Sequence, residues 1–396
     1  MLSSLLHSGV SGLALPVARY TGSGQTYSTL ARHHSQLQQD DLGLAFVLES
    51  REAWSAKCLF KEETVLALAF TAFIVGTLVS LATSWILVTR LERVGERFGL
   101  SEALLGIVAA LAADSPEITS SISALSQHQR TIGAGVVIGS NVFNLAALLG
   151  LGAVVSGFVA LHRRVVVLGG FVAMWTAACC VATTTGAIPT IVGLVLAGVV
   201  LVSYFVILGL RRNVLQRLPL PRRWLASISS AVDEEELELV VAIHPPRGRP
   251  IDVVSAFGAL VVVVLASIAM ERSGSELGHH FHVADAVIGG VVLAAVTSLP
   301  NAVAAVHLAS KGRGAAALST ALSSNNLNVV AGLLIPGALL GLASPSRAGI
   351  FTAASYMALT TLVLVMAFAQ RGLSRRTGWL IIAGYGVFVV GLLAVS

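Results

Sequence analysis

Apolar runs long enough to cross a bilayer recur along this chain, and they constrain its fold more than any other feature. A run of about 20 such residues spans the hydrocarbon core as a helix. Only 11% of the residues are charged, against about 25% in ordinary soluble domains. We therefore predict an all-α protein embedded in the lipid bilayer. The basic residues lie between the apolar runs, so the formal charge of +5 does not indicate a nucleic-acid partner.

The hydropathy pattern predicts ten membrane-spanning helices. Their approximate bounds are 63–89, 101–126, 131–158, 165–186, 188–209, 253–271, 283–310, 315–342, 349–369 and 377–395. Proline and charge predict that the segment between the fifth and sixth spans is a linker. The chain then divides into a tail of unassigned role, a first five-helix unit, a linker and a second five-helix unit: 1–62, 63–210, 211–252 and 253–396.

The Lys and Arg residues predict the orientation of these spans. The loops after spans one, three, five, seven and nine carry most of them. The loops after spans two, four, six and eight carry only Arg130, Arg272 and Arg347. The positive-inside rule therefore places the linker in the cytoplasm and both termini outside. We expect a multi-pass protein of the plasma membrane.

Two blocks of the sequence match each other without a gap. Gly106 to Ala153 aligns with Gly290 to Gly337 at an offset of 184 residues. Each block covers the second and third spans of its unit. Because five spans is an odd number, the second unit enters the membrane in the opposite sense. This predicts two inverted five-helix repeats, the construction of many secondary transporters, whose sites lie near the midplane where the repeats meet.

The stretch LAADSPEITSS places two carboxylates, Asp114 and Glu117, inside the second predicted span. Residues three apart share one face of a helix. A charged group at bilayer depth is costly, and where one occurs it marks a functional site. The pair therefore predicts a place where a cation is held.

Prolines interrupt the same span in both blocks. Pro116 lacks an N–H and frees the carbonyl of Ala112, as Pro300 does for Val296. Both helices are therefore predicted to break or kink at membrane depth. Lipid offers the freed oxygens no partner, and a dehydrated cation is one partner that would.

Neutral oxygen-bearing side chains accompany the acid pair in both blocks. Neither block's motif contains His or Cys, and sites made only of oxygen favour hard cations such as Ca²⁺ and Na⁺. Small polar residues also stabilise helix contacts in membranes, but two copies in register beside a buried acid pair favour a cation site. The predicted ligands are Asp114, Glu117, Ser140, Asn144, Thr297, Ser298, Asn301, Ser324 and Asn328.

At these motifs the chain resembles the cation/calcium exchanger superfamily, which includes the sodium/calcium exchangers. The α-repeats of that family read approximately G-T-S-x-P-E followed by G-S-N-x-x-N, and here they read AADSPE…GSNVFN and VTSLPN…SSNNLN. The resemblance covers about residues 63–395. It implies a ten-helix fold of two inverted halves that drives Ca²⁺ one way and Na⁺ or H⁺ the other. It also implies that the first and sixth spans slide against the remaining helices.

Three positions depart from the family pattern. Asn301 replaces the second-repeat acid, and Asn328 is an amide where some members carry an acid. Ala113 and Asp114 stand where the first repeat usually has threonine or glycine and then serine. A Ca²⁺ site usually needs about two carboxylates. We hypothesise that Asp114 supplies the missing charge and keeps the site at −2. If Asp114 points away, the site carries −1 and a monovalent cation is favoured.

The acid pair also bears on the counter-ion. Two carboxylates on one face repel each other, and a proton held between them relieves that repulsion. This favours proton-coupled exchange, with a transport rate that falls between about pH 8 and about pH 6.

These features predict a secondary active cation antiporter that exchanges Ca²⁺ for Na⁺ or H⁺ by alternating access. A monovalent cation (Na⁺/H⁺) antiporter is one alternative, and a non-transporting cation sensor or scaffold is another. The sequence contains no nucleophile–base pair, zinc motif or nucleotide-binding loop. We therefore predict neither an enzyme nor a primary pump, and no resident cofactor. The oligomeric state stays open.

Overall fold

The computed structural model describes residues 63–98 except 92 and 96, 108–209 except 109 and 162, 248–302, and 314–396. Leu66–Ser396 form one compact unit, and the description below concerns that unit. The predicted N-terminal tail and most of the predicted linker lie outside the described residues.

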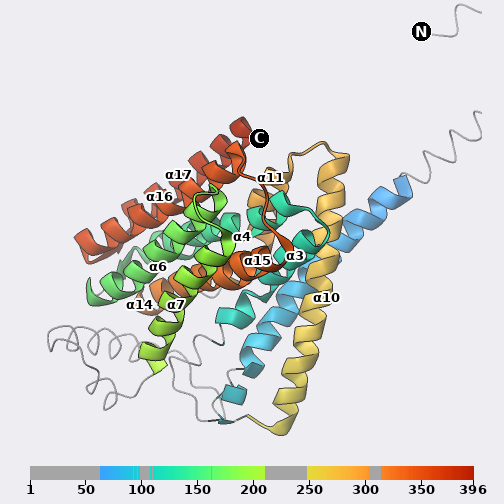
Figure 1. The fold of residues 1–396 in the computed structure, drawn as a ribbon. Helices are drawn as coiled ribbons and strands as arrows, with labels where there is room; N and C mark the ends of the chain where they lie inside the picture. Colours follow the sequence, from blue (N-terminus) through green and yellow to red (C-terminus); the bar gives the residue numbers. More distant parts are fainter. Residues whose placement is uncertain are drawn as a thin grey trace, which may run out of the picture. The chain divides into compact units, whose positions relative to one another are not determined.

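Seven helices among the described residues are long and apolar enough to cross a membrane (Figure 1). Each coincides with one of the predicted spans. They are Glu63–Gly95, Arg130–Ser156, α6 (Arg163–Thr184), α7 (Thr190–Gly209), α10 (Pro250–His280), α16 (Arg347–Gln370) and α17 (Arg375–Val395). The predicted count of ten is not confirmed, because spans 101–126 and 283–310 extend outside the described residues and the span 315–342 is divided into shorter helices.

Several helices are interrupted. One of the seven long helices, Arg130–Ser156, consists of α4 (Arg130–Asn144), a π-helical turn η1 (Leu145–Leu151) and α5 (Gly152–Ser156). Such turns are frequent at functional sites. The others are α3 (Ser115–Ser126), α11 (Asp285–Val287), η2 (Ile288–Leu293), α12 (Ala294–Thr297), α14 (Gly314–Leu327), η3 (Asn328–Leu334) and α15 (Ile335–Leu340).

Both predicted proline breaks are present, and they fall at equivalent positions of the two blocks. A single turn residue interrupts the helix at Asp114 and again at Ser298, each two residues before its proline. The carbonyl of Ala112, which Pro116 cannot bond, accepts the hydroxyl of Ser115. The freed oxygen of Ala112 therefore has a partner, as expected, but that partner is a neighbouring side chain and not a cation.

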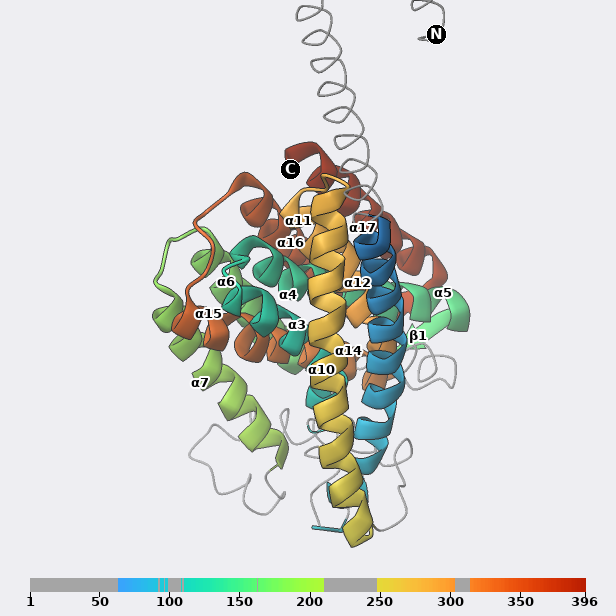
Figure 2. The same cartoon turned by 90° about the vertical axis from the view of Figure 1, so that its right-hand side faces the viewer.

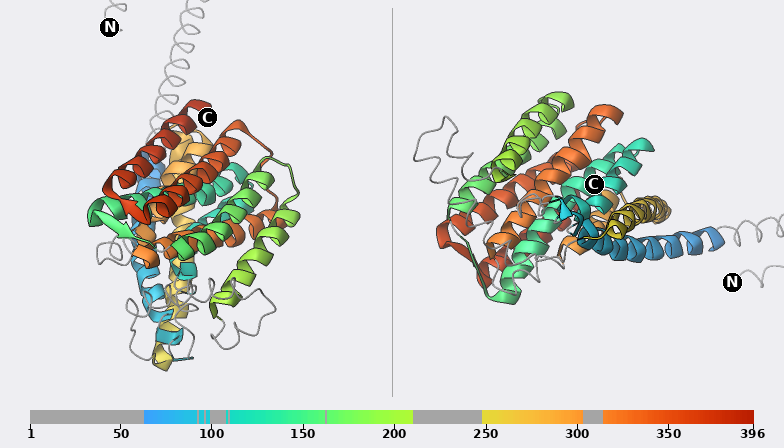
Figure 3. Two further views of the ribbon diagram at one scale, coloured as in Figure 1. Left: turned by 90° about the vertical axis from the view of Figure 1, so that its left-hand side faces the viewer. Right: turned by 90° about the horizontal axis from the view of Figure 1, so that it is seen from below.

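The helix α4 lies at the centre of the described unit and contacts α3, η2, α12 and α16 (Figure 3). Its approach to η2 is close because both helices present glycine there. A Cβ at Gly139 would overlap the backbone of Gly290. Glycine pairs of this kind let membrane helices approach backbone to backbone. This contact brings the first sequence block against the second.

The helix α10 lies beside the helix Glu63–Gly95 on one side and contacts α3 on the other (Figure 2). Ser80 and Ser267 join the first two helices through their hydroxyls at 3.0 Å. Near the start of α10, Arg90 Nη1 lies 2.5 Å from Asp252 Oδ1. The other oxygen of Asp252 accepts the backbone N–H of Arg249 at 2.7 Å, which caps the helix at its first turn.

A small two-stranded sheet departs from the all-helical prediction. Strand β1 (Phe158–Ala160) pairs antiparallel with β2 (Gly372–Ser374), with Val159 opposite Leu373. Each strand follows a long helix directly and lies in a loop predicted to be cytoplasmic. The hydrogen bonds between the strands satisfy backbone groups that a helix end leaves unpaired.

Candidate cation-binding site

The nine predicted ligands come from four places in the fold that converge on the centre of the described unit. Asp114 and Glu117 lie at the start of α3, while α4 supplies a serine and an asparagine. The end of α12 and the residues just after it supply three more side chains, and α14 and η3 supply the last two. No member of the set is more than 2% exposed: Asp114, Glu117, Ser140, Asn144, Thr297, Ser298, Asn301, Ser324 and Asn328.

Asp114 points toward the second sequence block. Its Oδ1 accepts the hydroxyl of Ser324 at 2.6 Å and the side-chain amide of Asn301 at 2.7 Å. The same Asn301 amide lies 3.4 Å from Glu117 Oε1. Both carboxylates therefore meet one amide, and Asp114 does not turn away from Glu117. The arrangement places two carboxylates in the site, not one.

Two asparagines that were not among the predicted ligands hold the blocks together. Asn141 donates its side-chain amide to the carbonyl of Asn325, and Asn325 donates to the carbonyl of Asn141, both at 3.1 Å. Each asparagine lies at the second position of its motif, SNVFN or SNNLN, so the pair obeys the sequence repeat. Their position within both repeated motifs is the sequence signal that could have identified them as functional residues.

The same symmetry orients two of the predicted ligands. Asn144 donates to Asn325 Oδ1 at 3.1 Å, and its equivalent Asn328 donates to Asn141 Oδ1 at 3.4 Å. Using their N–H groups in this way leaves the Oδ1 atoms of Asn144 and Asn328 without a hydrogen-bond partner. The amide oxygens are thus free to face a cation.

Unpartnered buried oxygens are the chemical signature of this site. A buried polar atom without a partner costs about 1–3 kcal/mol, so each one calls for an explanation. An anion would leave the carboxylate and amide oxygens among them unsatisfied, whereas a cation is a partner that oxygens of all these kinds can bind. The oxygens are Asp114 Oδ2, Glu117 Oε2, Asn144 Oδ1, Ser298 Oγ and Asn328 Oδ1.

Two predicted ligands are already engaged with the backbone. Thr297 donates to the carbonyl of Leu293 at 2.9 Å. Ser140 lies 3.4 Å from both the Thr297 hydroxyl and the carbonyl of Ala294. These hydroxyls join α4 to α12 and thereby stabilise the packing of the two helices. Their hydrogen bonds do not indicate a contact with a cation.

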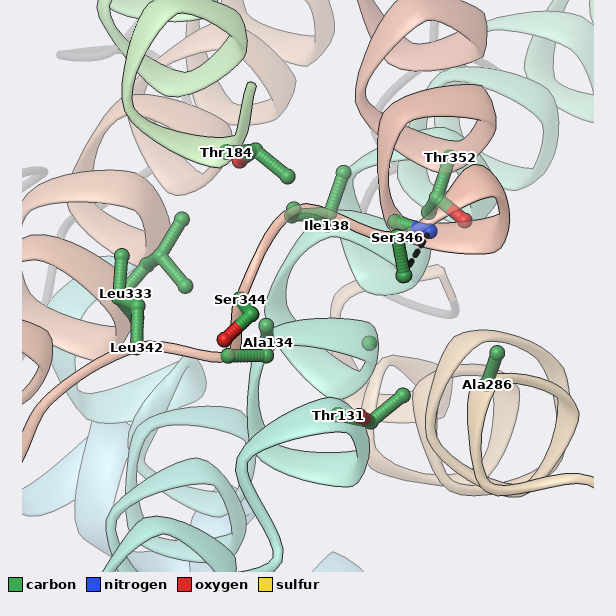
Figure 4. Close-up of a pocket in the computed structure, with 13 residues that line it drawn as sticks. Thr131, Ala134, Ile138, Thr184, Ala286, Leu333, Leu342, Ser344, Ser346 and Thr352 are labelled. Atoms are coloured by element: carbon green, nitrogen blue, oxygen red, sulfur yellow. Dashed lines mark hydrogen bonds between the residues drawn. The ribbon is translucent and has the colours of Figure 1, made fainter. Parts of the chain in front are cut away.

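A separate pocket lies at the N-terminal half of α4 (Figure 4). Thr131 and Ile138 line it from α4, and Ser344 and Thr352 line it from the segment around the start of α16. None of the nine predicted ligands lines this pocket. The acid pair is therefore not part of this pocket.

The fold and the site together define a class: an integral, multi-pass helical membrane protein in which two related sequence blocks enclose an oxygen-lined acid pair. The family profile described as "Sodium/calcium exchanger protein" matches residues 68–211 and again residues 252–394. The chain belongs to this family, whose members are transporters and not enzymes.

A curated relative and two solved structures place the chain further. The sodium/potassium/calcium exchanger 2 of Gallus gallus is 28% identical over 156 residues, which is 37% of this chain and 24% of that protein. The matched region is thus about a quarter of the relative's length.

The structural likenesses concern the fold. The sodium-calcium exchanger NCX_Mj shares 19% identity at a TM-score of 0.54, over 82% of this chain and 99% of that one. The H⁺/Ca²⁺ exchanger CAX shares 11% identity at a TM-score of 0.62, over 82% of this chain and 86% of that one.

Proposed function

We propose that this protein is a secondary active antiporter that exchanges Ca²⁺ for Na⁺ or H⁺ by alternating access. The observation that carries the proposal is the buried acid pair: Asp114 and Glu117 share the amide of Asn301, and each keeps one unpartnered oxygen. Two carboxylates balance a divalent cation where water is scarce. The neutral oxygens complete an all-oxygen ligand set of the kind hard cations require.

The direction of Asp114 favours a divalent over a monovalent cargo. A site with Glu117 alone would carry −1 and suit Na⁺. Because Asp114 lies beside Glu117 and bonds Ser324 and Asn301, the site carries −2 when both acids are ionised. In this proposal Asp114 replaces the carboxylate that the family pattern has at the position of Asn301. The monovalent antiporter is then the less favoured alternative.

The counter-ion follows from the same two carboxylates. Like charges held close together in a water-poor site bind a proton readily when the cation leaves. We therefore favour H⁺ as the counter-ion, with Na⁺ as the rival. The two structural neighbours differ in this respect, since CAX is an H⁺/Ca²⁺ exchanger and NCX_Mj is a sodium-calcium exchanger.

The proposal includes the membrane arrangement. It places two inverted five-helix repeats, 63–210 and 253–396, on either side of a cytoplasmic linker, 211–252, with both termini outside the plasma membrane. The reciprocal bonds between Asn141 and Asn325 support a symmetric meeting of the two blocks. The excess of Lys and Arg in alternate loops supports the orientation.

Radiocalcium uptake into proteoliposomes of the purified protein tests the proposal. Uptake is measured with an outward proton gradient, with an outward sodium gradient and with neither. We expect uptake under the proton gradient and none without a gradient. Calcium binding without uptake under any gradient would identify a sensor instead, and sodium or proton flux without calcium flux would identify a monovalent antiporter.

A further inference from the structure

A third buried carboxylate lies in the membrane region, apart from the acid pair. Glu271 belongs to α10 and its residue is 0% exposed. The sequence prediction placed it at the end of the span 253–271 and assigned it no role. Within the described residues, Glu271 forms no ion pair. A buried carboxylate that no salt bridge neutralises calls for a functional explanation.

The surroundings of Glu271 are polar and come from α3. Gln127, directly after α3, donates its side-chain amide to Glu271 Oε2 at 3.0 Å, and the same nitrogen lies 3.1 Å from Ser123 Oγ. The other oxygen, Oε1, is buried and has no partner. Rotating the amide of Gln127 by half a turn would present its oxygen instead of its nitrogen. Glu271, Ser123 and Gln127 then offer carboxylate, hydroxyl and amide oxygens to one point.

A polar stripe on α3 connects this point with the acid pair. Its members follow one another at intervals of three or four residues, which keeps them on neighbouring faces of the helix. Ser120, midway along the stripe, is 0% exposed and its hydroxyl has no partner. At about 1.5 Å per residue, Gln127 lies about 15 Å along the axis from Glu117. The stripe comprises Asp114, Glu117, Ser120, Ser123 and Gln127.

We propose that Glu271, Ser123 and Gln127 form a second cation site at the outer end of the α3–α10 contact. The site takes the same hard cation as the acid pair and receives it from the outer medium before it passes Ser120. The unpartnered Glu271 Oε1 and Ser120 Oγ are the oxygens that a passing cation satisfies. The position of this site on the outer side and its role in cation passage rest on the proposed function. Cation binding at Glu271 rests only on the contacts among Glu271, Gln127 and Ser123.

Equilibrium binding of radiocalcium to the purified full chain tests the site. We compare the wild type with Glu271→Gln, with Glu117→Gln, and with Glu276→Gln as the matched control, because Glu276 is an exposed carboxylate of the same helix. We expect a tight and a weak class of bound calcium in the wild type and in the control. Glu271→Gln removes the weak class, and Glu117→Gln removes the tight one. Weak-class binding that is intact in Glu271→Gln overturns the proposal.

Transport kinetics separate a cation site from a merely structural contact. We expect Glu271→Gln to raise the KM for calcium about tenfold at an unchanged kcat, since one charge-assisted contact is lost before the cation reaches the acid pair. Glu271→Asp should raise KM less, and it serves as the test if the glutamine variant does not fold. A wild-type KM in both variants overturns the inference and leaves the proposed antiporter standing. Loss of the weak class in a protein that does not transport overturns the antiporter and supports the site.

Discussion

Asn301 donates its side-chain amide to Asp114 Oδ1 at 2.7 Å. The two residues come from different sequence blocks, 187 positions apart, and each departs from the pattern of the family. The amide stands where a second acid is expected, and the acid stands where a serine is expected. In the proposed site this contact makes the two departures compatible, because a carboxylate and an amide meet between the blocks with the carboxylate on the side of the first block.

Neutralising either carboxylate should abolish calcium transport. In Glu117→Gln or Asp114→Asn the site carries −1, which does not balance a divalent cation in a buried site. We expect uptake into proteoliposomes to fall at least about a hundredfold, because losing even a group that only orients a metal ligand costs about 10–100-fold. Asp285→Asn removes a half-exposed carboxylate that pairs with His279 and is the control. Uptake near the wild-type rate in both acid variants would exclude the pair as the cation site.

The transport rate should fall as the pH is lowered from about pH 8 to about pH 6. Protons and calcium compete for the same two carboxylates, so a lower pH reduces the fraction of protein that can hold the divalent ion. The effect should appear as a rise in KM that added calcium overcomes. Initial uptake rates at several calcium concentrations, with the same outward proton gradient at each external pH, measure it. A flat profile together with a strict requirement for sodium would rule out proton coupling.

Gly139→Ala should destabilise the protein. Its Cβ would overlap the backbone of Gly290, so α4 and η2 would have to separate. Overpacking of this kind costs about 1–3 kcal/mol. Gly386→Ala is the matched control, because a Cβ there meets nothing within 4 Å. Thermal unfolding in detergent should show a lower midpoint for Gly139→Ala only. Equal midpoints in the two variants would show that the close approach of α4 and η2 does not exist.

Asn141 and Asn325 should behave as one unit. Because each donates to the carbonyl of the other at 3.1 Å, replacing either with Ala removes a buried hydrogen bond between the blocks, at a cost of about 0.5–1.5 kcal/mol. Replacing both should cost less than the sum of the single changes, since the two contacts lie side by side. A double-mutant cycle on the unfolding free energy measures this coupling. Strict additivity would contradict the paired geometry.

The long apolar helices were predictable because the bilayer imposes one length and one composition on them. The helix α16 (Arg347–Gln370) illustrates this, since it contains the whole predicted span 349–369. The broken helices were predictable in place but not in detail. Pro116 and Pro300 indicated the breaks, whereas the hydroxyl of Ser115 that satisfies Ala112 depends on a side-chain rotamer. The pairing of β1 with β2 joins loops more than 200 residues apart, and no local signal announces it.

The acid pair was predictable from the cost of burying charge, and the sequence repeat indicated where its neutral partners lie. The direction of Asp114 was not predictable, because a residue at a helix break can turn to either side. Glu271 was missed for a related reason. It stands at the end of a predicted span, where a charged residue usually reaches water, and only the structure shows that it is buried and bonded to Gln127.

Exchanging the positions of the charge tests the central claim most directly. Radiocalcium uptake is measured for Asp114→Ser, for Asn301→Asp and for the double variant, which moves the second carboxylate back to the second repeat. If the two acids together hold the transported cation, Asp114→Ser alone is inactive and the double variant recovers calcium uptake. An Asp114→Ser variant as active as the wild type, or a double variant as inactive as the single one, would contradict the claim that Asp114 has replaced the acid missing at Asn301.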